Sequence, residues 1–432
     1  MALTEVLILV LSFVIFLSLR VPIAWSIGLA GLFTLLVSMP FLPSVTTLAQ
    51  RMATSLDSFT LTAIPFFILA GQIMNRGGIA VRLINFAKAI VGPLPGGLAF
   101  VNIISCMLFG AISGSAVAAA SAIGGFMNPM MEKEGYSKPF SAAINVTSAT
   151  TGLIIPPSNV LIVYSLASGG VSIAALFIAG YMPGILVGLA LMIVAAVYSI
   201  IKKYPTDKLV SFKEFFRRFI DAFPSLMLLV VVIGGIVAGI FTATEASAIA
   251  VVYTLVLGFV YKEIRVKDIA PILLETTKTS AIVLLLVATS IAMSWVMSYE
   301  NIPQEISSAL LSISDNPIVI LILINLILLF VGIFMDMTPA VLIFTPIFLP
   351  IVTAIGMDPI HFGIIMILNL CIGLCTPPVG SVLFVGCSVA GLKIQHVIKP
   401  LIPLFIAMIV VLIIITYFPS ITLWLPDLFD LI

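Results

Sequence analysis

Two pairs of adjacent prolines interrupt apolar segments of this chain, and they mark the residues best placed to bind an ion. The first pair is Pro156 and Pro157, and the second is Pro377 and Pro378, which lie 221 positions later. Proline lacks the amide hydrogen with which a helix bonds the carbonyl four residues earlier. The sequence therefore predicts four carbonyl oxygens without a helical partner, those of Gly152, Leu153, Gly373 and Leu374. Inside an apolar medium such carbonyls need another partner, and a cation is one candidate.

Small and hydroxyl-bearing residues form a second group that could bind a cation. They are Gly110, Ser113, Gly114 and Ser115. Oxygen ligands without a carboxylate suit a hard monovalent cation better than a transition metal. At the offset of 221, Ser113 corresponds to Phe334 and Ile155 to Thr376, so two related sites would share main-chain oxygens but differ in side chains. The alternative is that these small residues only let helices pack closely.

A third group could bind an anion. Helices that restart after a hairpin turn or a proline pair expose N-termini with partial positive charge. The polar residues expected to bind substrate there are Ser115, Asn159, Asp336, Thr338 and Ser381. Asp336 could instead be a plain N-cap of the helix that follows it. Arg51 is a further candidate for binding a carboxylate, and a solvated loop arginine is the alternative.

The composition decides the class of protein. Of 432 residues, 62% are hydrophobic and 9% are charged. Apolar runs of about 18 residues or more predict transmembrane helices, so we expect an all-α polytopic protein in a lipid bilayer. A net charge of +1 argues against nucleic acid as a partner. The four cysteines lie in apolar segments beside only two histidines in the whole chain, which favours packing over a metal site.

The elements that must position these residues follow from the apolar runs. Single spans are expected at residues 3–19, 22–39, 58–75, 172–200, 224–240, 245–261, 276–298 and 401–417. A polar interval is expected at 40–57, and an amphipathic interfacial segment at 79–91. Residues 98–131 and 316–352 are too long for one span and predict re-entrant helical hairpins. Residues 140–166 and 362–390 predict spans that are broken at the proline pairs.

These elements divide the chain into two inverted repeats, at residues 1–200 and 222–432, joined by a basic linker at 201–221. The excess of lysine and arginine in this linker places it in the cytoplasm. The alternation of spans then places both termini in the periplasm, and Arg51 is the main basic residue on the outer side. Glu245 lies in the pattern Thr242-Ala-Thr-Glu245, which is typical of a capping box, and a proton relay is the alternative.

No nucleotide-binding motif is present, so we expect an ion gradient to supply the energy. One cation that crosses 100 mV releases about 2.3 kcal/mol. No cluster of catalytic groups is present either, so the sequence does not predict an enzyme.

Several motifs together resemble the large membrane subunit of tripartite ATP-independent periplasmic (TRAP) transporters. They are Ala63-Ile-Pro-Phe-Phe-Ile-Leu-Ala-Gly71, Phe109-Gly-Ala-Ile-Ser-Gly-Ser115, Gly152-Leu-Ile-Ile-Pro-Pro157, Gly239-Ile-Phe-Thr-Ala-Thr-Glu-Ala246 and Gly332-Ile-Phe-Met-Asp-Met-Thr-Pro-Ala340. The resemblance covers essentially the whole chain. Thr60 and Ala243 stand where the family often has proline, which affects turns more than sites.

The resemblance implies a sodium-coupled importer of organic acids, such as C4-dicarboxylates or sialic acids, that works by an elevator motion in the bacterial inner membrane. It implies two partners: a small four-helix membrane subunit, expected to be a separate chain, and a periplasmic substrate-binding protein. It implies one sodium near Gly110, Ser113, Gly152, Ile155 and Pro157. It implies a second sodium near Gly332, Gly373, Thr376 and Val379.

Three alternatives stay open at this point. A related stand-alone divalent-anion/sodium symporter would transport without any soluble receptor. An intramembrane enzyme would need clustered polar groups at depth, and a channel would show currents above carrier turnover.

Overall fold

The computed structural model describes residues 2–206, 210–314 and 316–432. Within these ranges the regular elements are twenty α-helices and one short 3₁₀ helix, η1. Seven of the described helices are long and apolar enough to cross a membrane, or eight if the bent pair formed by α3 with η1 and α4 is one span. The predicted all-α fold is confirmed.

The first ten α-helices and η1 precede the basic linker. They are α1 (Ala2–Ser18), α2 (Ile23–Ser38), α3 (Phe41–Ser55), η1 (Phe59–Thr62), α4 (Ala63–Arg76), α5 (Ile79–Val91), α6 (Gly97–Ser113), α7 (Ala116–Lys133), α8 (Lys138–Thr151), α9 (Asn159–Ala167) and α10 (Ile173–Lys202). Helices α6 and α7 form the first hairpin. Helices α8 and α9 are the two halves of the first broken span, and the residues between them contain Pro156 and Pro157.

The second ten helices follow the same plan. They are α11 (Phe212–Val237), α12 (Ala243–Val260), α13 (Val266–Tyr299), α14 (Ile302–Ile313), α15 (Pro317–Phe334), α16 (Met337–Ala354), α17 (Pro359–Leu374), α18 (Ser381–Val389), α19 (Ile394–Tyr417) and α20 (Ser420–Leu428). Helices α15 and α16 form the second hairpin, and α17 and α18 are the second broken span. Helices α16, α17 and α19 each begin 221 residues after α7, α8 and α10.

One contact locates the symmetry axis that relates the two repeats. The Cys371 thiol donates to the main-chain carbonyl of Thr150 at 3.4 Å, and these two residues are 221 positions apart. A residue can touch its own symmetry mate only close to the axis. The pseudo-two-fold axis therefore passes where α17 crosses α8, beside both interrupted segments.

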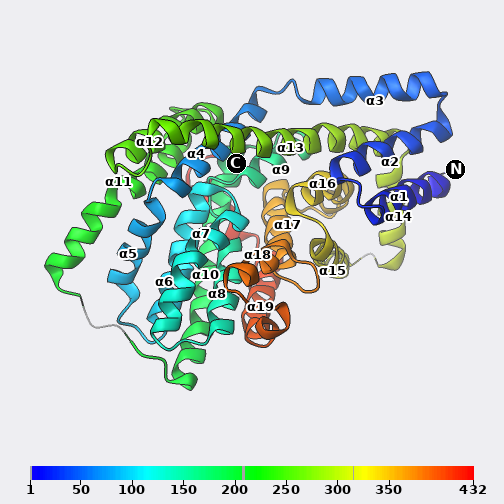
Figure 1. The fold of residues 1–432 in the computed structure, drawn as a ribbon. Coiled ribbons are helices and arrows are strands. Elements are labelled where there is room, and N and C mark those ends of the chain that lie inside the picture. The colour runs from blue at the N-terminus through cyan, green and yellow to red at the C-terminus, as the bar shows by residue number, and fades with distance from the viewer. Residues whose placement is uncertain (1, 207–209, 315) are drawn as a thin grey trace.

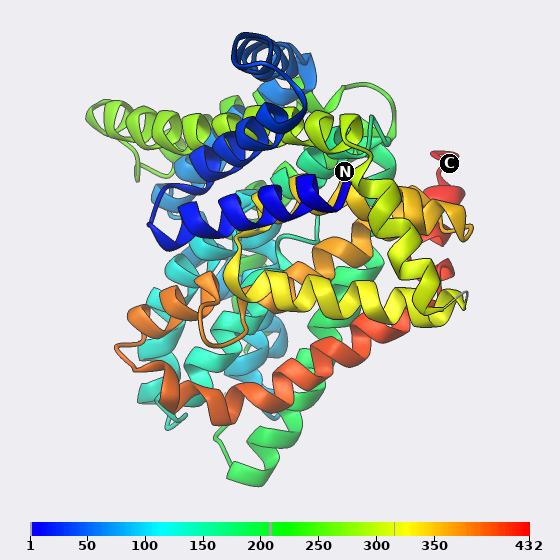
Figure 2. The ribbon, with the colours of Figure 1, turned by 90° about the vertical axis from the view of Figure 1, so that its right-hand side faces the viewer.

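The helices gather into two bodies (Figures 1 and 2). In one, α4 packs mainly against α12 and α13, and α13 also lies along α2 and α3. In the other, α8 packs against α6, α7 and α19, and α17 packs against α15 and α16. Figure 1 shows α3, α12 and α13 running along the upper edge of the molecule, and α6, α7 and α10 lie below them. The hairpins and broken spans thus share one body, and α4 and α13 face it from the other.

Three boundaries differ from the sequence-based expectation. The interval at 40–57, expected only to be polar and to contain no span, contains the amphipathic helix α3, because its polar residues alternate with apolar ones at a helical period. Helix α11 begins at Phe212, inside the predicted linker, because an aromatic stripe along its first turns packs on α5: the ring of Phe86 lies 5.7 Å from that of Phe219. Helix α13 begins ten residues earlier than expected, at Val266.

Two local predictions of secondary structure are confirmed. The hydroxyl of Thr242 accepts from the Glu245 amide at 3.3 Å, and the Glu245 carboxylate accepts from the Thr242 amide at 2.8 Å. This is the capping box expected at the start of α12. The amphipathic segment at 79–91 is helix α5, with the predicted bounds.

Pairs of glycines bring each hairpin against its broken span. A Cβ added to Gly152 would lie 2.2 Å from the Gly110 Cα, and one added to Gly373 would lie 2.5 Å from the Gly332 Cα. Real side chains do not approach backbone so closely. Only glycine therefore allows α6 to reach the first break and α15 to reach the second.

We expect Gly152→Ala to lower the stability of the purified protein by about 2–3 kcal/mol, because the added methyl group forces α6 away from the break. Gly125→Ala is the matched control, since nothing lies within 4 Å of its added Cβ. That control should be neutral or stabilise α7 by about 0.5–1 kcal/mol. Thermal unfolding in detergent measures both, and equal unfolding temperatures for the two variants would contradict the glycine contact.

Candidate functional site

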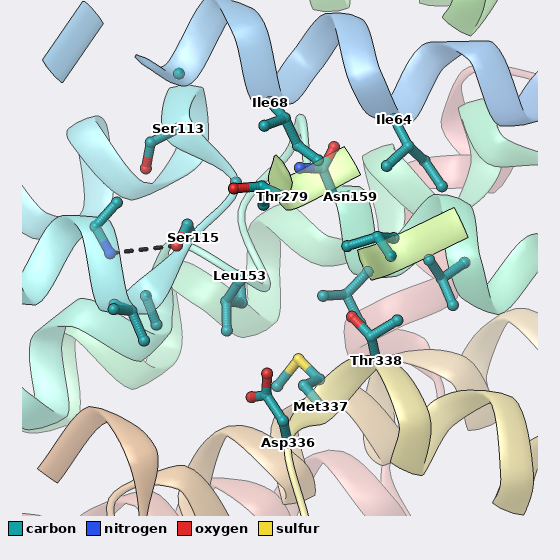
Figure 3. A pocket seen from close by; sticks show the side chains of 18 of the residues that line it. Ile64, Ile68, Ser113, Ser115, Leu153, Asn159, Thr279, Asp336, Met337 and Thr338 are labelled. Atoms are coloured by element: carbon teal, nitrogen blue, oxygen red, sulfur yellow. Dashed lines mark hydrogen bonds between the residues drawn. The ribbon is translucent and has the colours of Figure 1, made fainter. Parts of the chain in front are cut away.

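A cavity of about 200 Å³ lies where the two hairpin tips and the first broken span meet α4 and α13. Its polar lining residues are Gln72, Asn75, Ser113, Ser115, Asn159, Thr279, Asp336 and Thr338. Ile64, Ile68, Leu153 and Val283 supply much of the apolar lining. Figure 3 shows Ser115 and Asn159 on one side of this cavity and Asp336 and Thr338 on another.

Two residues, Gly114 and Ser115, form the tip of the first hairpin between α6 and α7. Gly114 adopts a left-handed conformation with φ of 60°, which glycine tolerates without strain. Ser115 then caps α7, because its hydroxyl accepts from the Ala118 amide at 3.2 Å. The N-terminus of α7 consequently opens into the cavity, as do those of α9 at Asn159 and α16 at Met337. Three partial positive charges converge on one space.

Unpaired oxygens gather at this tip and at the first break. The hydroxyls of Ser113 and Ser158 and the Oδ1 of Asn159 are buried and have no hydrogen-bond partner among the described residues. The side chain of Asn159 lies against the tip, since a Cβ on Gly114 would be 3.1 Å from its Nδ2. Buried oxygens without partners are costly in a protein interior. Oxygen atoms of this kind can act as ligands of a cation.

The main chain adds further oxygens at the first break. The carbonyls of Gly152, Leu153 and Ile155 accept no hydrogen bond from any described residue. The proline pair predicted unpaired carbonyls at Gly152 and Leu153, and this prediction is confirmed. The side chain of Ile155 packs on α10, where a Cβ on Gly184 would lie 2.3 Å away. Pro157 belongs to the same interrupted segment.

The second break differs from the first, and one expectation about it is wrong. The carbonyl of Gly373 does have a partner, because it accepts from the Thr376 amide at 2.9 Å. The chain turns tightly here, and this turn replaces the bond that Pro377 cannot make. The Thr376 hydroxyl donates to the Ile372 carbonyl at 2.8 Å, and a donating hydroxyl can still accept from or bind a ligand. The carbonyl of Leu374 accepts no hydrogen bond from the part of the chain that the structure describes, and Val379 is exposed.

Four of the six residues predicted to bind substrate line the cavity: Ser115, Asn159, Asp336 and Thr338. Ser381 is not among the lining residues, although its neighbour Val382 is. Asp336 occupies the N-cap position of α16, but its side chain accepts no capping hydrogen bond. Asp336 therefore has the position of an N-cap without its usual hydrogen bond, and it lines the cavity.

Arg51 lies outside the cavity. Its guanidinium carbon is 4.7 Å from the centre of the Trp295 ring, in a separate hollow between α3 and α13. The reason is the 65° bend between α3 and the helix pair that contains α4. That bend turns the whole of α3 away from the substrate space.

Three lining residues were not predicted from the sequence: Gln72 and Asn75 on α4, and Thr279 on α13. A signal for the first two does exist in the sequence. They are amides three positions apart in an otherwise apolar span, and such spacing puts both side chains on one helix face. Thr279 carried no such signal, because hydroxyls recur along the first half of α13.

The charge of the lining limits what it can bind. Among the described lining residues Asp336 is ionisable, and none is lysine, arginine or histidine. An organic anion in this space would be held by helix N-termini, amides and hydroxyls, without a salt bridge to a basic side chain.

The family model for the tripartite ATP-independent periplasmic transporter, DctM component, matches residues 10–421. The chain belongs to this family. The TRAP large permeases are membrane transport proteins, so this chain is a multi-pass membrane protein of a transporter.

Curated relatives match the sequence of this chain along most of its length. The chain is 58% identical to the uncharacterized protein YgiK of Salmonella typhimurium, over 97% of this chain and 96% of that protein. It is 41% identical to the C4-dicarboxylate TRAP transporter large permease protein DctM of Pseudomonas aeruginosa, over 93% and 94% of the two chains. It is also 41% identical to the sialic acid TRAP transporter large permease protein SiaM of Vibrio cholerae, over 88% and 89%.

A solved structure shares the fold. The YdaH transporter of Alcanivorax borkumensis superposes with a TM-score of 0.66 at 12% identity, covering 87% of this chain and 88% of that one. At this identity the likeness shows the architecture alone.

We expect Asn159→Ala to raise the substrate KM of transport about tenfold, because it removes a cavity amide at a helix N-terminus. Arg51→Ala should change KM less than twofold, because Arg51 is outside the cavity. Initial uptake rates in proteoliposomes measure both. A large effect of the Arg51 variant alone would show that substrate binds elsewhere.

Proposed function

We propose that this chain is the membrane-spanning subunit of a sodium-coupled importer of small organic acids. The proposal rests on one observation: groups that suit a cation and groups that suit an anion lie at the same cavity. Unpaired oxygens at the first hairpin tip and the first break suit a cation, and three helix N-termini beside them suit an anion. Coupling follows, because a bound cation and a bound carboxylate stabilise each other across the same space.

The proposed cation sites are those that the resemblance implied. Gly110, Ser113, Gly152, Ile155 and Pro157 would form the first, to which the structure suggests adding Ser158 and Asn159. Gly332, Gly373, Thr376 and Val379 would form the second. Sodium is the coupling ion that oxygen-only ligands favour, and no nucleotide site competes as an energy source.

The two packed bodies support an elevator motion. In this proposal α4, α12 and α13 belong to the static body, and the hairpins with the broken spans carry substrate past them. The basic residues at 202–218 would face the cytoplasm, and both termini would face the periplasm. The location would be the bacterial inner membrane.

Two partners complete the proposed transporter: a small membrane subunit and a periplasmic binding protein. The substrate class would be that of the named relatives, C4-dicarboxylates or sialic acids. Proteoliposomes that contain both membrane subunits should take up the acid only when the loaded binding protein is outside. Transport without the binding protein would instead favour a stand-alone symporter.

Replacing external sodium by potassium should abolish uptake, because the proposal makes the sodium gradient the source of energy for transport. Radiolabelled uptake measures this directly. Unchanged uptake in potassium would remove the sodium assignment.

Ser113→Ala should raise the sodium concentration for half-maximal uptake about fivefold to tenfold, since it removes one proposed ligand. Ser105→Ala is the control, because the Ser105 hydroxyl on α6 is also buried and has no hydrogen-bond partner within the described ranges. If both variants match the wild type, the Ser113 hydroxyl only packs.

A further inference from the structure

The first turns of α11 carry a row of exposed apolar residues on one helix face, at spacings of four, four and three positions. The row and the exposed fraction of each residue are Phe212 at 81%, Phe216 at 51%, Ile220 at 56% and Phe223 at 45%. Val230 continues the same face further along the helix and is 60% exposed. Because this face runs on into the apolar part of α11, we expect lipid to cover it along its whole length.

Helix α11 is longer than the hydrocarbon core of a bilayer is thick. Its 26 residues span about 39 Å at the α-helical rise, and the hydrocarbon core measures about 30 Å. About six residues therefore extend beyond the hydrocarbon. They belong to the N-terminal end, because every charged residue of α11 lies between Lys213 and Asp221. In the proposed topology this end lies among the lipid headgroups at the cytoplasmic surface.

Basic side chains border the apolar row on one side. They are Lys213 and Arg217, and each follows directly after a phenylalanine of the row. Lys213 is exposed, and the side chain of Arg217 is 77% exposed. On the other side of the row α11 packs on α5, where the rings of Phe219 and Phe86 are 5.7 Å apart (Figure 1). The open side of the row is therefore the positively charged one.

The acidic side chains nearby already have basic partners. Glu214 accepts from Nη2 of Arg217 at 2.8 Å and from Nε of Arg218 at 2.9 Å. Asp221 accepts from Nε of Arg82 on α5 at 3.2 Å. A guanidinium has five N–H donors, so Arg217 keeps donors for a second anion. The turns before Asp221 carry three basic residues and one acidic residue, which leaves an excess of positive charge beside the apolar row.

We propose that the first turns of α11 bind an anionic phospholipid such as phosphatidylglycerol. Lys213 and Arg217 bind its phosphate, and its acyl chains lie along the exposed row. The row selects a lipid over a soluble phosphate, because a soluble anion gains nothing from apolar contact. The basic side chains select an anionic lipid over phosphatidylcholine, whose headgroup carries a compensating cation. Each basic residue near an anionic surface strengthens binding about fivefold.

The test uses the full chain, purified in a neutral detergent. Phosphatidylglycerol or phosphatidylcholine with the same acyl chains is added in steps, and thermal unfolding is recorded at each step. Glycerol 3-phosphate, which is the headgroup phosphate without acyl chains, is added in a third series. The unfolding temperature against lipid concentration gives an apparent Kd for each lipid.

The charge variant is the double substitution Lys213→Gln and Arg217→Gln. Its matched control is Lys133→Gln with Lys393→Gln, which removes the same charge from exposed lysines at the ends of α7 and α19. A second variant, Phe212→Ser with Phe216→Ser, removes the apolar contact. All of these side chains are exposed, so the variants should fold like the wild type.

We expect phosphatidylglycerol to raise the unfolding temperature by about 3 °C more than phosphatidylcholine does, and glycerol 3-phosphate to have no effect. The charge variant should raise the Kd for phosphatidylglycerol at least about tenfold, and its control less than about twofold. The phenylalanine variant should weaken both lipids. Raising the salt concentration to about 0.5 M should weaken phosphatidylglycerol at least about threefold, because the contact is electrostatic and exposed.

Equal shifts with the two lipids would overturn the proposal, as would equal Kd values for the charge variant and its control. A shift with glycerol 3-phosphate alone would show a site for a soluble anion instead. Loss of the lipid effect when the small membrane subunit is added would show that a protein covers this face. Uptake of an organic acid is a separate measurement, so each of these results leaves the proposed function standing.

Discussion

An unpaired main-chain carbonyl cannot remain without a partner inside a membrane protein, and this constraint organises the chain. A helix satisfies its own carbonyls, and a proline pair prevents it from doing so. The fold places two such interruptions beside a pseudo-two-fold axis, where Cys371 touches the carbonyl of Thr150. Glycines at the same level then bring a hairpin against each break. The structure thus creates oxygen-rich sites by removing hydrogen bonds rather than by adding charged side chains.

The two sites satisfy this constraint differently. The first break leaves the carbonyls of Gly152, Leu153 and Ile155 without hydrogen bonds from described residues, beside the unpartnered hydroxyl of Ser113. The second break closes a tight turn onto the carbonyl of Gly373. The two breaks share an architecture but differ in how many of their carbonyls accept hydrogen bonds. Two cation sites built on them would therefore have unequal affinity.

Much of this arrangement could be predicted from the sequence, because apolar length and proline placement are local signals. They gave the hairpins, the broken spans and the offset of 221 residues that relates them. Four of the six proposed substrate residues also line the cavity, because each lies at a helix N-terminus that proline or glycine punctuation reveals. Arg51 was misplaced, since no local signal shows the bend that turns α3 away. Gln72, Asn75 and Thr279 were missed. The spacing of the two amides places them on one face of α4, but only the packing of α4 and α13 against the other body shows that they reach the cavity.

The central claim is that the interrupted segments bind sodium directly, before any acid arrives. Equilibrium binding of sodium-22 to the purified subunit, without partners or substrate, tests this most directly. The account predicts saturable binding that excess potassium does not displace and that Ser113→Ala weakens. Sodium that binds without saturation, or that potassium displaces equally well, would contradict it.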